Sequence, residues 1–286
     1  MKILIAADME GITGVVHGDH TNSSHAEYGR FRMLMTQDVN AAIRGALAAG
    51  ADEVIVSDGH GDNRNILLEH LDPRALLNSG TPRPLSMVEG IDGGVDGVLF
   101  IGYHARVGTP NAILDHTWSS ARVDGVWIVQ ADGRWQPIGE IGLNAAVCGH
   151  FGVPVLMISG DQTACAEAKT LLGPIETAIV KRATGRTSAE CLPPRVTAEI
   201  IEQTAARAVG HLFADVPPKP FVLTPPITAV IEFIRSEMAD AAALLPGAPA
   251  GAKTLGVRPE YVALAEPQAA GALPATVPQV QDIGTY

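Results

Sequence analysis

The sequence predicts an α/β fold: a mainly parallel sheet flanked by helices, with a β-hairpin insertion and a smaller C-terminal subdomain. The first observation is a set of short β-branched runs, most of them too continuously apolar to keep one face in water, which is typical of buried parallel strands. The runs are residues 2–7, 53–57, 97–102, 153–159 and 177–182. The second observation is that helical patterns separate these runs, and such alternation indicates an α/β protein.

The longest helical pattern covers residues 26–49. Its apolar side chains recur every three or four residues, as Phe31, Leu34, Met35, Val39 and Ile43 show, and Gly50 provides a stop signal. Three further helices are expected over residues 140–149, 163–172 and 195–213.

The pattern changes to short extended pieces at residues 123–137. The turn dipeptides Asp124-Gly125 and Asp132-Gly133 predict a β-hairpin insertion there. A proline-rich loop at residues 217–226 precedes an apolar run, 228–234, that we expect to begin the smaller subdomain. We therefore divide the chain into a catalytic α/β domain, residues 1–215, and a C-terminal part, residues 216–286. The last twenty residues lack periodicity and are expected to form a loosely ordered arm.

Composition narrows the class of protein. The 286 residues are 47% hydrophobic, and only three are cysteines, without a C-x-x-C pair, so a reducing cytoplasmic location is expected. No apolar stretch approaches the length of a membrane span, so membrane insertion is excluded. The formal net charge is −11 and there is no basic run, so nucleic acid is not an expected partner.

Acidic and imidazole side chains follow three of the predicted strands. Asp8 and Glu10 follow the first strand, His60 the second and His104 the third. Ligands of open parallel sheets gather beyond the carboxyl ends of the strands, so these side chains are expected to form a metal site. Glu140, at the start of a predicted helix, is a candidate fifth ligand.

The ligand types predict which metals bind and how many. Oxygen and imidazole nitrogen without thiolate suit catalytic Zn²⁺, with Mn²⁺ or Co²⁺ as alternatives. Two divalent ions are favoured, because three buried carboxylates and a hydroxide would balance their charge, whereas one ion would leave the carboxylates undercompensated.

These residues lie in motifs that resemble the M55 peptidases, a family that includes D-aminopeptidases. The motifs are Asp8-Met9-Glu10-Gly11-Ile12, Ser57-Asp58-Gly59-His60, Ser86-Met87-Val88-Glu89-Gly90, Gly102-Tyr103-His104-Ala105-Arg106, Asp115-His116 and Gly139-Glu140-Ile141-Gly142-Leu143-Asn144-Ala145. They appear in family order within the first 165 residues. After about Gly247 the chain departs from the family pattern, because Pro- and Ala-rich sequence replaces the expected final helix.

The resemblance implies the roles of individual residues. Asp8, Glu10, His60, His104 and Glu140 correspond to the ligands of a binuclear zinc site, with Asp8 as the bridging carboxylate, and His116 corresponds to the catalytic histidine. The resemblance also implies an aminopeptidase that acts on short peptides or amino-acid amides, with D-amino-acid preference, and a self-compartmentalising homodecamer. The metals are expected to activate water, and His116 to act as general acid or base.

Two rival functions use the same residues. Two-metal carboxylate sites also serve phosphoryl transfer, although basic groups are lacking near the motifs here. A fold that closes off the ligands would instead make a non-catalytic metal-binding protein. The choice between D and L substrates is not readable from any motif.

Several other residues have competing interpretations. His17, His20 and His25 crowd one loop but fit no familiar ligand spacing, which favours a solvated loop. The methionines near the motifs are expected in the core or packed behind the ligands. Glu89 and Arg106 are candidates to orient ligands or bind substrate, with ordinary surface or ion-pair roles as the alternative. Asp58 and Asp62 flank His60 and are expected to support it, to cap the loop, or to have no special role. Cys165 follows a helix cap expected at Asp161 or Thr163, and cysteine catalysis is rejected.

Overall fold

A computed structural model describes residues 1–214 and 218–244, together with the strands at 253–256 and 261–264. Its centre is a seven-stranded sheet in the order β3-β2-β1-β4-β7-β8-β9. All neighbouring pairs are parallel except β8 and β9. The strands are β1 (Lys2–Ala7), β2 (Glu53–Asp58), β3 (Ala75–Asn78), β4 (Gly97–Ile101), β7 (Val155–Asp161), β8 (Glu176–Gly185) and β9 (Ser188–Cys191). The predicted mainly parallel sheet is confirmed, and β3 and β9 are the strands that the sequence did not indicate.

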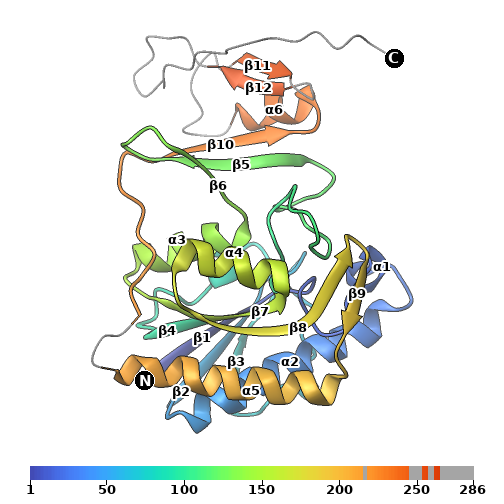
Figure 1. The fold of residues 1–286 in the computed structure, drawn as a ribbon, viewed down its shortest axis with the longest axis vertical. Helices are drawn as coiled ribbons and strands as arrows, with labels where there is room; N and C mark the ends of the chain where they lie inside the picture. The colour runs from blue at the N-terminus through green and yellow to red at the C-terminus, as the bar shows by residue number, and fades with distance from the viewer. Residues whose placement is uncertain (215–217, 245–252, 257–260, 265–286) are drawn as a thin grey trace.

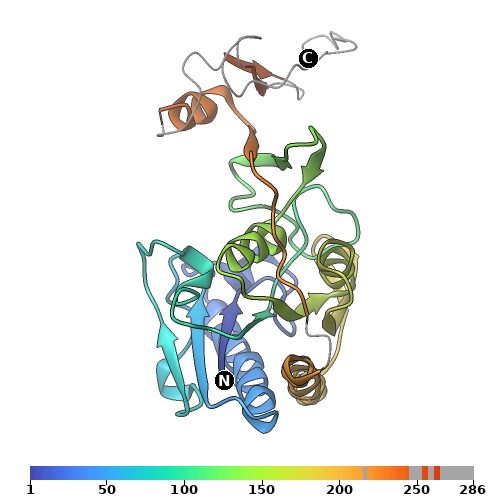
Figure 2. The ribbon, with the colours of Figure 1, turned by 90° about the vertical axis from the view of Figure 1, so that its left-hand side faces the viewer.

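Helices cover both faces of this sheet (Figures 1 and 2). The helices α2 (Tyr28–Ala48) and α5 (Pro194–Gly210) pack side by side on one face, and α3 (Glu140–His150) and α4 (Gln162–Leu172) cover the other. Alternate residues of β1 divide between the two layers: Ile3 and Ile5 join the core under α2 and α5, while Leu4 and Ala6 join the core under α3 and α4. This period-two division is why the strand is apolar throughout.

The helix ends follow their local sequences. Pro194 occupies the first turn of α5, where its missing N–H costs no helical hydrogen bond. Asp161 caps α4, because its Oδ1 accepts hydrogen bonds from the backbone N–H groups of Thr163 and Ala164, both at 2.8 Å. The capping alternative at Asp161 is therefore the one adopted. A 3₁₀ turn, His211–Phe213, continues α5 over the rest of the predicted helix.

A second, antiparallel sheet lies above α3 and α4 in Figure 1. Its order is β10-β5-β6, formed by β5 (Val123–Val129), β6 (Trp135–Pro137) and β10 (Thr228–Phe233). The predicted hairpin is confirmed, with Asp132-Gly133 in its turn. The prediction of a turn at Asp124-Gly125 is wrong: both residues lie in β5, where β10 pairs with Gly125 and Val123 and skips Asp124. This dipeptide therefore marks a bulge.

The expected C-terminal part is connected to this insertion. Its first strand, β10, pairs with β5, and α6 (Ser236–Ala242) and the pair β11 (Lys253–Gly256) and β12 (Tyr261–Leu264) follow. The division of the chain at residue 215 stays a prediction. The expected arm, residues 267–286, lies outside the described residues, and of the segment after Gly247 the structure describes only β11 and β12.

Short elements complete the chain. They are the helix α1 (Gly18–Thr21) and the 3₁₀ turns Leu68–His70 and Ser86–Val88. In the part of the chain that the structure describes, no helix is both long and apolar enough to span a membrane.

Candidate metal centre

The carboxyl ends of three adjacent central strands meet at one edge of the sheet. The chain passes from β1 to β2 on one side and later to β4 on the other, so this edge is a topological switch point, where open α/β sheets bind ligands. Asp8 and Glu10 follow β1, His60 follows β2 and His104 follows β4. Asp8, Glu10 and His104 are buried, with 2%, 5% and 1% of their surface exposed.

Two glycines allow the loops to approach this closely. A Cβ at Gly11 would lie 2.0 Å from the carbonyl oxygen of Tyr103, and one at Gly102 would lie 2.3 Å from the carbonyl oxygen of Asp8. Gly102 also has a φ of 77°, in the left-handed region that favours glycine. The chain therefore needs glycine at both positions to bring Glu10 and His104 together.

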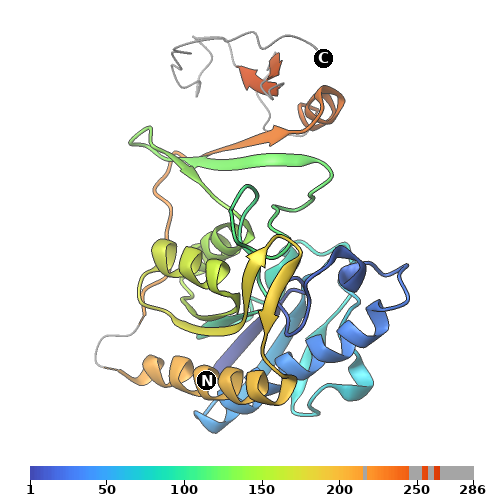
Figure 3. The ribbon, with the colours of Figure 1, turned by 45° about the vertical axis from the view of Figure 1, so that its right-hand side comes forward.

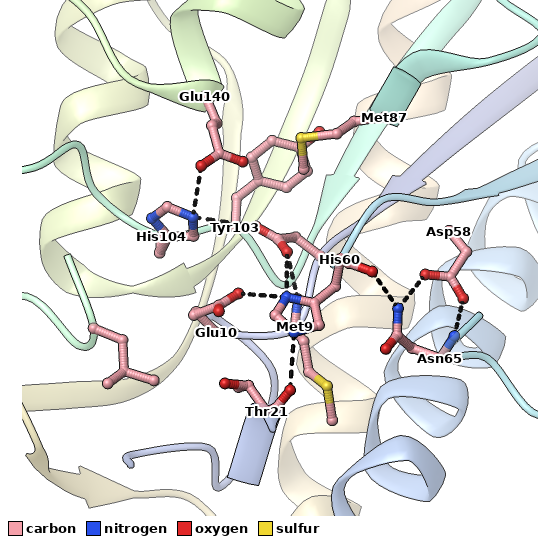
Figure 4. A network of polar contacts seen from close by, with 12 residues as sticks. Met9, Glu10, Thr21, Asp58, His60, Asn65, Met87, Tyr103, His104 and Glu140 are labelled. Carbon is pink, nitrogen blue, oxygen red and sulfur yellow. Dashed lines mark hydrogen bonds and ion pairs between the residues drawn. The ribbon is translucent and has the colours of Figure 1, made fainter. Parts of the chain in front are cut away.

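Asp8 lies between His60 and His104, two histidines that Figure 4 shows together with Glu10 and Glu140. Its Oδ1 is 3.4 Å from Nδ1 of His60, and its Oδ2 is 3.3 Å from Nε2 of His104. Glu10 approaches from the His60 side, with Oε2 3.1 Å from Nδ1 of His60. Asp8, Glu10 and His104 thus offer ligand atoms that all lie within 4.8 Å of one another.

Glu140 and His116 complete the other side. Glu140 is the first residue of α3, and its Oε1 lies 3.5 Å from Nε2 of His104 and 3.9 Å from Nε2 of His116. The rings of His104 and His116 stack with centroids 4.0 Å apart. The structure therefore brings all five predicted ligands and the predicted catalytic histidine to one place.

Backbone carbonyls fix the orientation of each imidazole ring. Nε2 of His60 lies 3.1 Å from the carbonyl oxygen of Thr21, and Nδ1 of His104 lies 2.9 Å from that of Ala105. Nδ1 of His116 lies 2.8 Å from the carbonyl oxygen of Leu114. A carbonyl oxygen only accepts, so each of these nitrogens donates, and in a neutral ring the opposite nitrogen presents a lone pair to the cluster. Metal-binding histidines have this arrangement.

Several buried atoms of the cluster have no hydrogen-bond partner, which suits atoms that bind a metal ion. Among the described residues, Oδ2 of Asp8, Oε2 of Glu10 and Nε2 of His104 are buried without a hydrogen-bond partner. Buried polar atoms are costly unless something binds them. Oxygen and nitrogen ligands of this kind suit a catalytic divalent ion.

The electrostatics point the same way. Burial opposes the charged form of Asp8, but contacts with His104 and His60 hold the pKa of this carboxyl below its usual range. Burial likewise opposes a charge on His104, yet Glu140 and Asp8 raise its pKa well above the ordinary value. The carboxylates therefore require positive charge beside them, which protons on the histidines or metal cations can supply.

Asp58 and Asn65 organise the loop that carries His60. The Asp58 carboxylate accepts hydrogen bonds from the backbone N–H of Asn65, the side chain of Asn65 and the backbone N–H of Ile66. The same Asn65 amide donates to the carbonyl oxygen of His60 at 2.6 Å. Of the roles considered for Asp58, the structure shows a support behind His60.

A buried lysine holds the loop that carries Asp8 and Glu10. Lys181 lies on β8 with no exposed surface, and its Nζ donates to the carbonyl oxygens of Glu10, Ile12 and Val15 at 2.6, 2.9 and 2.6 Å. Three acceptors match the three N–H bonds of an ammonium group. Burial lowers the pKa of Lys181 to about 8, which still favours the charged form at neutral pH.

Asp38, on α2, holds the same loop at Thr13. Its carboxylate accepts hydrogen bonds from the backbone N–H and the hydroxyl of Thr13 at 2.9 and 3.0 Å. Burial raises the pKa of Asp38 to about 6 despite these two donors. Neither Lys181 nor Asp38 was singled out from the sequence, because each contact joins residues far apart in the chain.

The loop histidines do not converge on one point. His17 and His25 both face Asp19, at 3.2 and 3.6 Å, while His20 stacks on Phe31 with ring centroids 3.8 Å apart. Their loop nevertheless borders the site, because Thr21 belongs to it and contacts His60.

The remaining candidates have ordinary contacts. Glu89 accepts a hydrogen bond from the backbone N–H of Leu85, Asp62 pairs with Arg64, and the backbone N–H of Arg106 donates to Glu167. Cys165 is buried and burial raises its pKa to about 12, which agrees with the rejection of a cysteine nucleophile.

Comparison with known proteins agrees with these observations. A model of peptidase family M55, described as D-aminopeptidase, matches residues 1–263. The D-aminopeptidase of Bacillus subtilis (strain 168) is 39% identical over 249 residues, which cover 86% of this chain and 86% of that protein. A solved structure, described as "Zn-dependent D-aminopeptidase DppA from Bacillus subtilis, a self-compartmentalizing protease", matches with a TM-score of 0.80 and 37% identity, covering 86% of each chain. The resemblance in the motifs is thereby confirmed, and this chain belongs to peptidase family M55, the D-aminopeptidase family.

Proposed function

We propose that this protein is a metallo-aminopeptidase that hydrolyses the amino-terminal amide bond of short peptides or amino-acid amides, with preference for D-amino acids. The observation that carries the proposal is the convergence of Asp8, Glu10, His60, His104 and Glu140 at the switch point of the sheet, with buried ligand atoms lacking hydrogen bonds. The relatives described as D-aminopeptidases support the substrate class over the rival phosphoesterase function.

These five residues would hold two divalent ions, and Zn²⁺ is the metal named for the related structure. Glu10 and His60 lie on one side of Asp8, while His104 and Glu140 lie on the other. Asp8 would be the ligand that the two ions share. When bound, such ions lower the pKa of water toward neutrality and polarise the carbonyl group under attack.

His116 is suited to move the proton. Its Nδ1 donates to the carbonyl oxygen of Leu114, so Nε2 is the atom that exchanges a proton. The side chain is 15% exposed, compared with 1% for the neighbouring His104, so a substrate can reach it. We assign to Nε2 of His116 the uptake of a proton from the attacking water, as general base, and its delivery to the departing amine nitrogen, as general acid.

The acidic cluster also suits the other end of the substrate. The free amine that a peptide presents at its amino terminus would bind one of the ions or pair with a carboxylate that the ions leave free. At longer range, the formal net charge of −11 favours a protonated amine over an anionic phosphate ester.

Assembly and location extend the proposal. The related structure is described as a self-compartmentalizing protease, and we propose that this chain also forms a homo-oligomer, as a decamer. We further propose that it works in the cytoplasm, in keeping with its three cysteines, none of which is paired in a disulfide.

A turnover screen tests the activity. Paired D- and L-aminoacyl p-nitroanilides and dipeptides are assayed beside p-nitrophenyl phosphate, with metal-stripped protein and with protein restored by Zn²⁺, Mn²⁺ or Co²⁺. We expect hydrolysis of the D-aminoacyl compounds only after metal is restored. Turnover of the phosphate ester alone would establish the rival function, and faster turnover of the L compounds would reverse the stereochemical assignment. Metal uptake without any turnover would indicate a non-catalytic metal protein.

A further inference from the structure

His116 lies on a segment with an unusual backbone. Asn111, Leu114 and Trp118 have φ values of 54°, 49° and 57°, in the left-handed region, and none of them is glycine. Residues other than glycine are strained in this region, and the conformation persists only where surrounding contacts hold it. The contacts around residues 111–118 therefore decide where the His116 ring lies.

The loop after β4 holds one side of this segment. The backbone N–H of His116 donates to the carbonyl oxygen of Ala105 at 3.3 Å, and the N–H of Val107 donates to Oγ1 of Thr117 at 3.3 Å. The N–H of Gly108 donates to Oδ2 of Asp115 at 2.8 Å. These contacts leave Oδ1 of Asp115 and the backbone of Leu114 to be held from elsewhere.

Arg186 holds the opposite side. It lies in the turn between β8 and β9, whose tip is beside the loop that carries His116 (Figure 3). Its carbonyl oxygen accepts the N–H of Leu114 at 2.9 Å. Its Nε donates to Oδ1 of Asp115 at 2.9 Å, and its Nη2 donates to the carbonyl oxygen of Asp115 at 3.2 Å. The planar guanidinium thus binds both the side chain and the backbone of one residue.

We propose that Asp115 and Arg186 are positioning residues that place Nε2 of His116 for proton transfer. The inference rests on the proposed role of His116. Leu114 makes the connection direct, because its N–H is held by Arg186 while its carbonyl oxygen accepts from Nδ1 of His116. A displacement at the β8–β9 turn therefore reaches the imidazole through a single residue.

If the Asp115–Arg186 pair served only stability, its loss would lower the free energy of unfolding and would not specifically lower turnover. The side chains of Arg186 and Asp115 are 51% and 13% exposed, and ion pairs near the surface contribute little to the free energy of unfolding. The fold should survive loss of the pair. A displaced catalytic group, in contrast, lowers turnover even when the fold and the metal are intact.

The test uses Asp115→Asn, Arg186→Gln and Arg186→Lys in zinc-loaded, full-length protein, with a D-aminoacyl p-nitroanilide as substrate. We expect kcat to fall roughly tenfold to a hundredfold in Asp115→Asn and Arg186→Gln, with KM and zinc content nearly unchanged. Arg186→Lys keeps the charge but loses the planar fork, so it should recover only part of the rate. The double variant should be no slower than the slower single variant, because both substitutions remove the same Arg186–Asp115 contact.

Two reference variants separate the possible failures. Arg195→Gln removes an exposed arginine of α5 that pairs with Glu199, and it should leave kcat unchanged. His116→Ala reports on the proposed function itself. Normal kcat in the Asp115 and Arg186 variants with an inactive His116→Ala would overturn the inference alone, whereas an active His116→Ala would overturn the role of His116. Loss of zinc, or failure of all three variants to fold, would also overturn the inference.

Discussion

Two parts of the candidate metal centre are held in different ways: the strand side, formed by Asp8, His60 and His104, and the loop side, formed by His116. On one side, Asp8, His60 and His104 lie one to three residues after the ends of buried parallel strands, so the sheet fixes where the segment that carries each of them begins. On the other side, His116 lies on a loop with left-handed residues, and contacts from neighbouring loops hold it. Glu140 lies between these two cases, because it begins a helix, and its Oε1 accepts the N–H of Trp118 at 2.7 Å.

This difference agrees with the two tasks of the site. Metal ligands must keep their separations within a few tenths of an ångström, and strand ends in a closed core provide that rigidity. A group that exchanges protons must also meet the substrate, and the half-buried loop of His116 gives that access. We therefore expect substitutions on the strand side to remove metal, and substitutions on the loop side to remove turnover alone.

The largest effect should come from comparing Asp8→Asn with His116→Ala. Asp8→Asn removes the charge shared between His60 and His104, so it should abolish both metal binding and turnover. His116→Ala should lower kcat by about 10²–10⁴-fold, the usual contribution of a general acid or base, while metal content stays normal. Metal content is measured by mass spectrometry after dialysis, beside initial rates.

His150→Ala provides the matched control, because His150 is an exposed histidine at the end of α3. It should keep both metal and rate. If His116→Ala lost metal as Asp8→Asn does, His116 would be a ligand, and the contrast between the two sides would disappear.

A second prediction concerns Lys181, which holds the loop that carries Asp8 and Glu10. Lys181→Met removes the donor to three carbonyl groups of the loop that carries Asp8 and Glu10. The carbonyl oxygen of Ile12 still accepts the N–H of Val15 at 3.1 Å, whereas those of Glu10 and Val15 lose their donor. We expect the free energy of unfolding to fall by about 3–5 kcal/mol, measured by urea denaturation. Lys169→Met, at an exposed position of α4, should change it by less than about 0.5 kcal/mol. A small loss in Lys181→Met would show that water or loop rearrangement replaces the ammonium group.

The same contrast explains how much the sequence could predict. The place of Asp8, His60 and His104 at one edge of the sheet was predictable, because apolar runs locate the strands and parallel strands bring their carboxyl ends to one edge. His116 was assigned only through resemblance, because its place depends on contacts with Ala105 and with the distant β8–β9 turn. Lys181 was missed for a similar reason: a lysine within a predicted strand gives no sign of carbonyl groups 166 to 171 positions away.

The wrong turn at Asp124-Gly125 shows the limit of a local signal. The dipeptide is common in hairpin turns, yet a Cβ at Gly125 would lie 2.1 Å from the ring of Trp127, so the glycine serves side-chain packing within β5. Pairing with β10, about a hundred residues later, decides the outcome. No window of sequence around Gly125 contains that partner.

The smallest expected effect is a pH dependence of stability that comes from Asp38, which holds the same loop as Lys181 through Thr13. Because burial raises the pKa of Asp38 from 3.8 to about 6, its favourable contribution to stability is complete below pH 3.8 and is lost as pH rises through about 6. The whole shift corresponds to about 3 kcal/mol, of which about 1 kcal/mol falls between pH 5 and pH 8. Asp38→Asn is neutral throughout, so the stability of the wild type relative to this variant should decrease over that interval. Urea denaturation of both proteins at each pH measures the difference, and ionisations common to both cancel. A constant difference would mean that the two donors of Thr13 keep the Asp38 carboxyl charged throughout this interval.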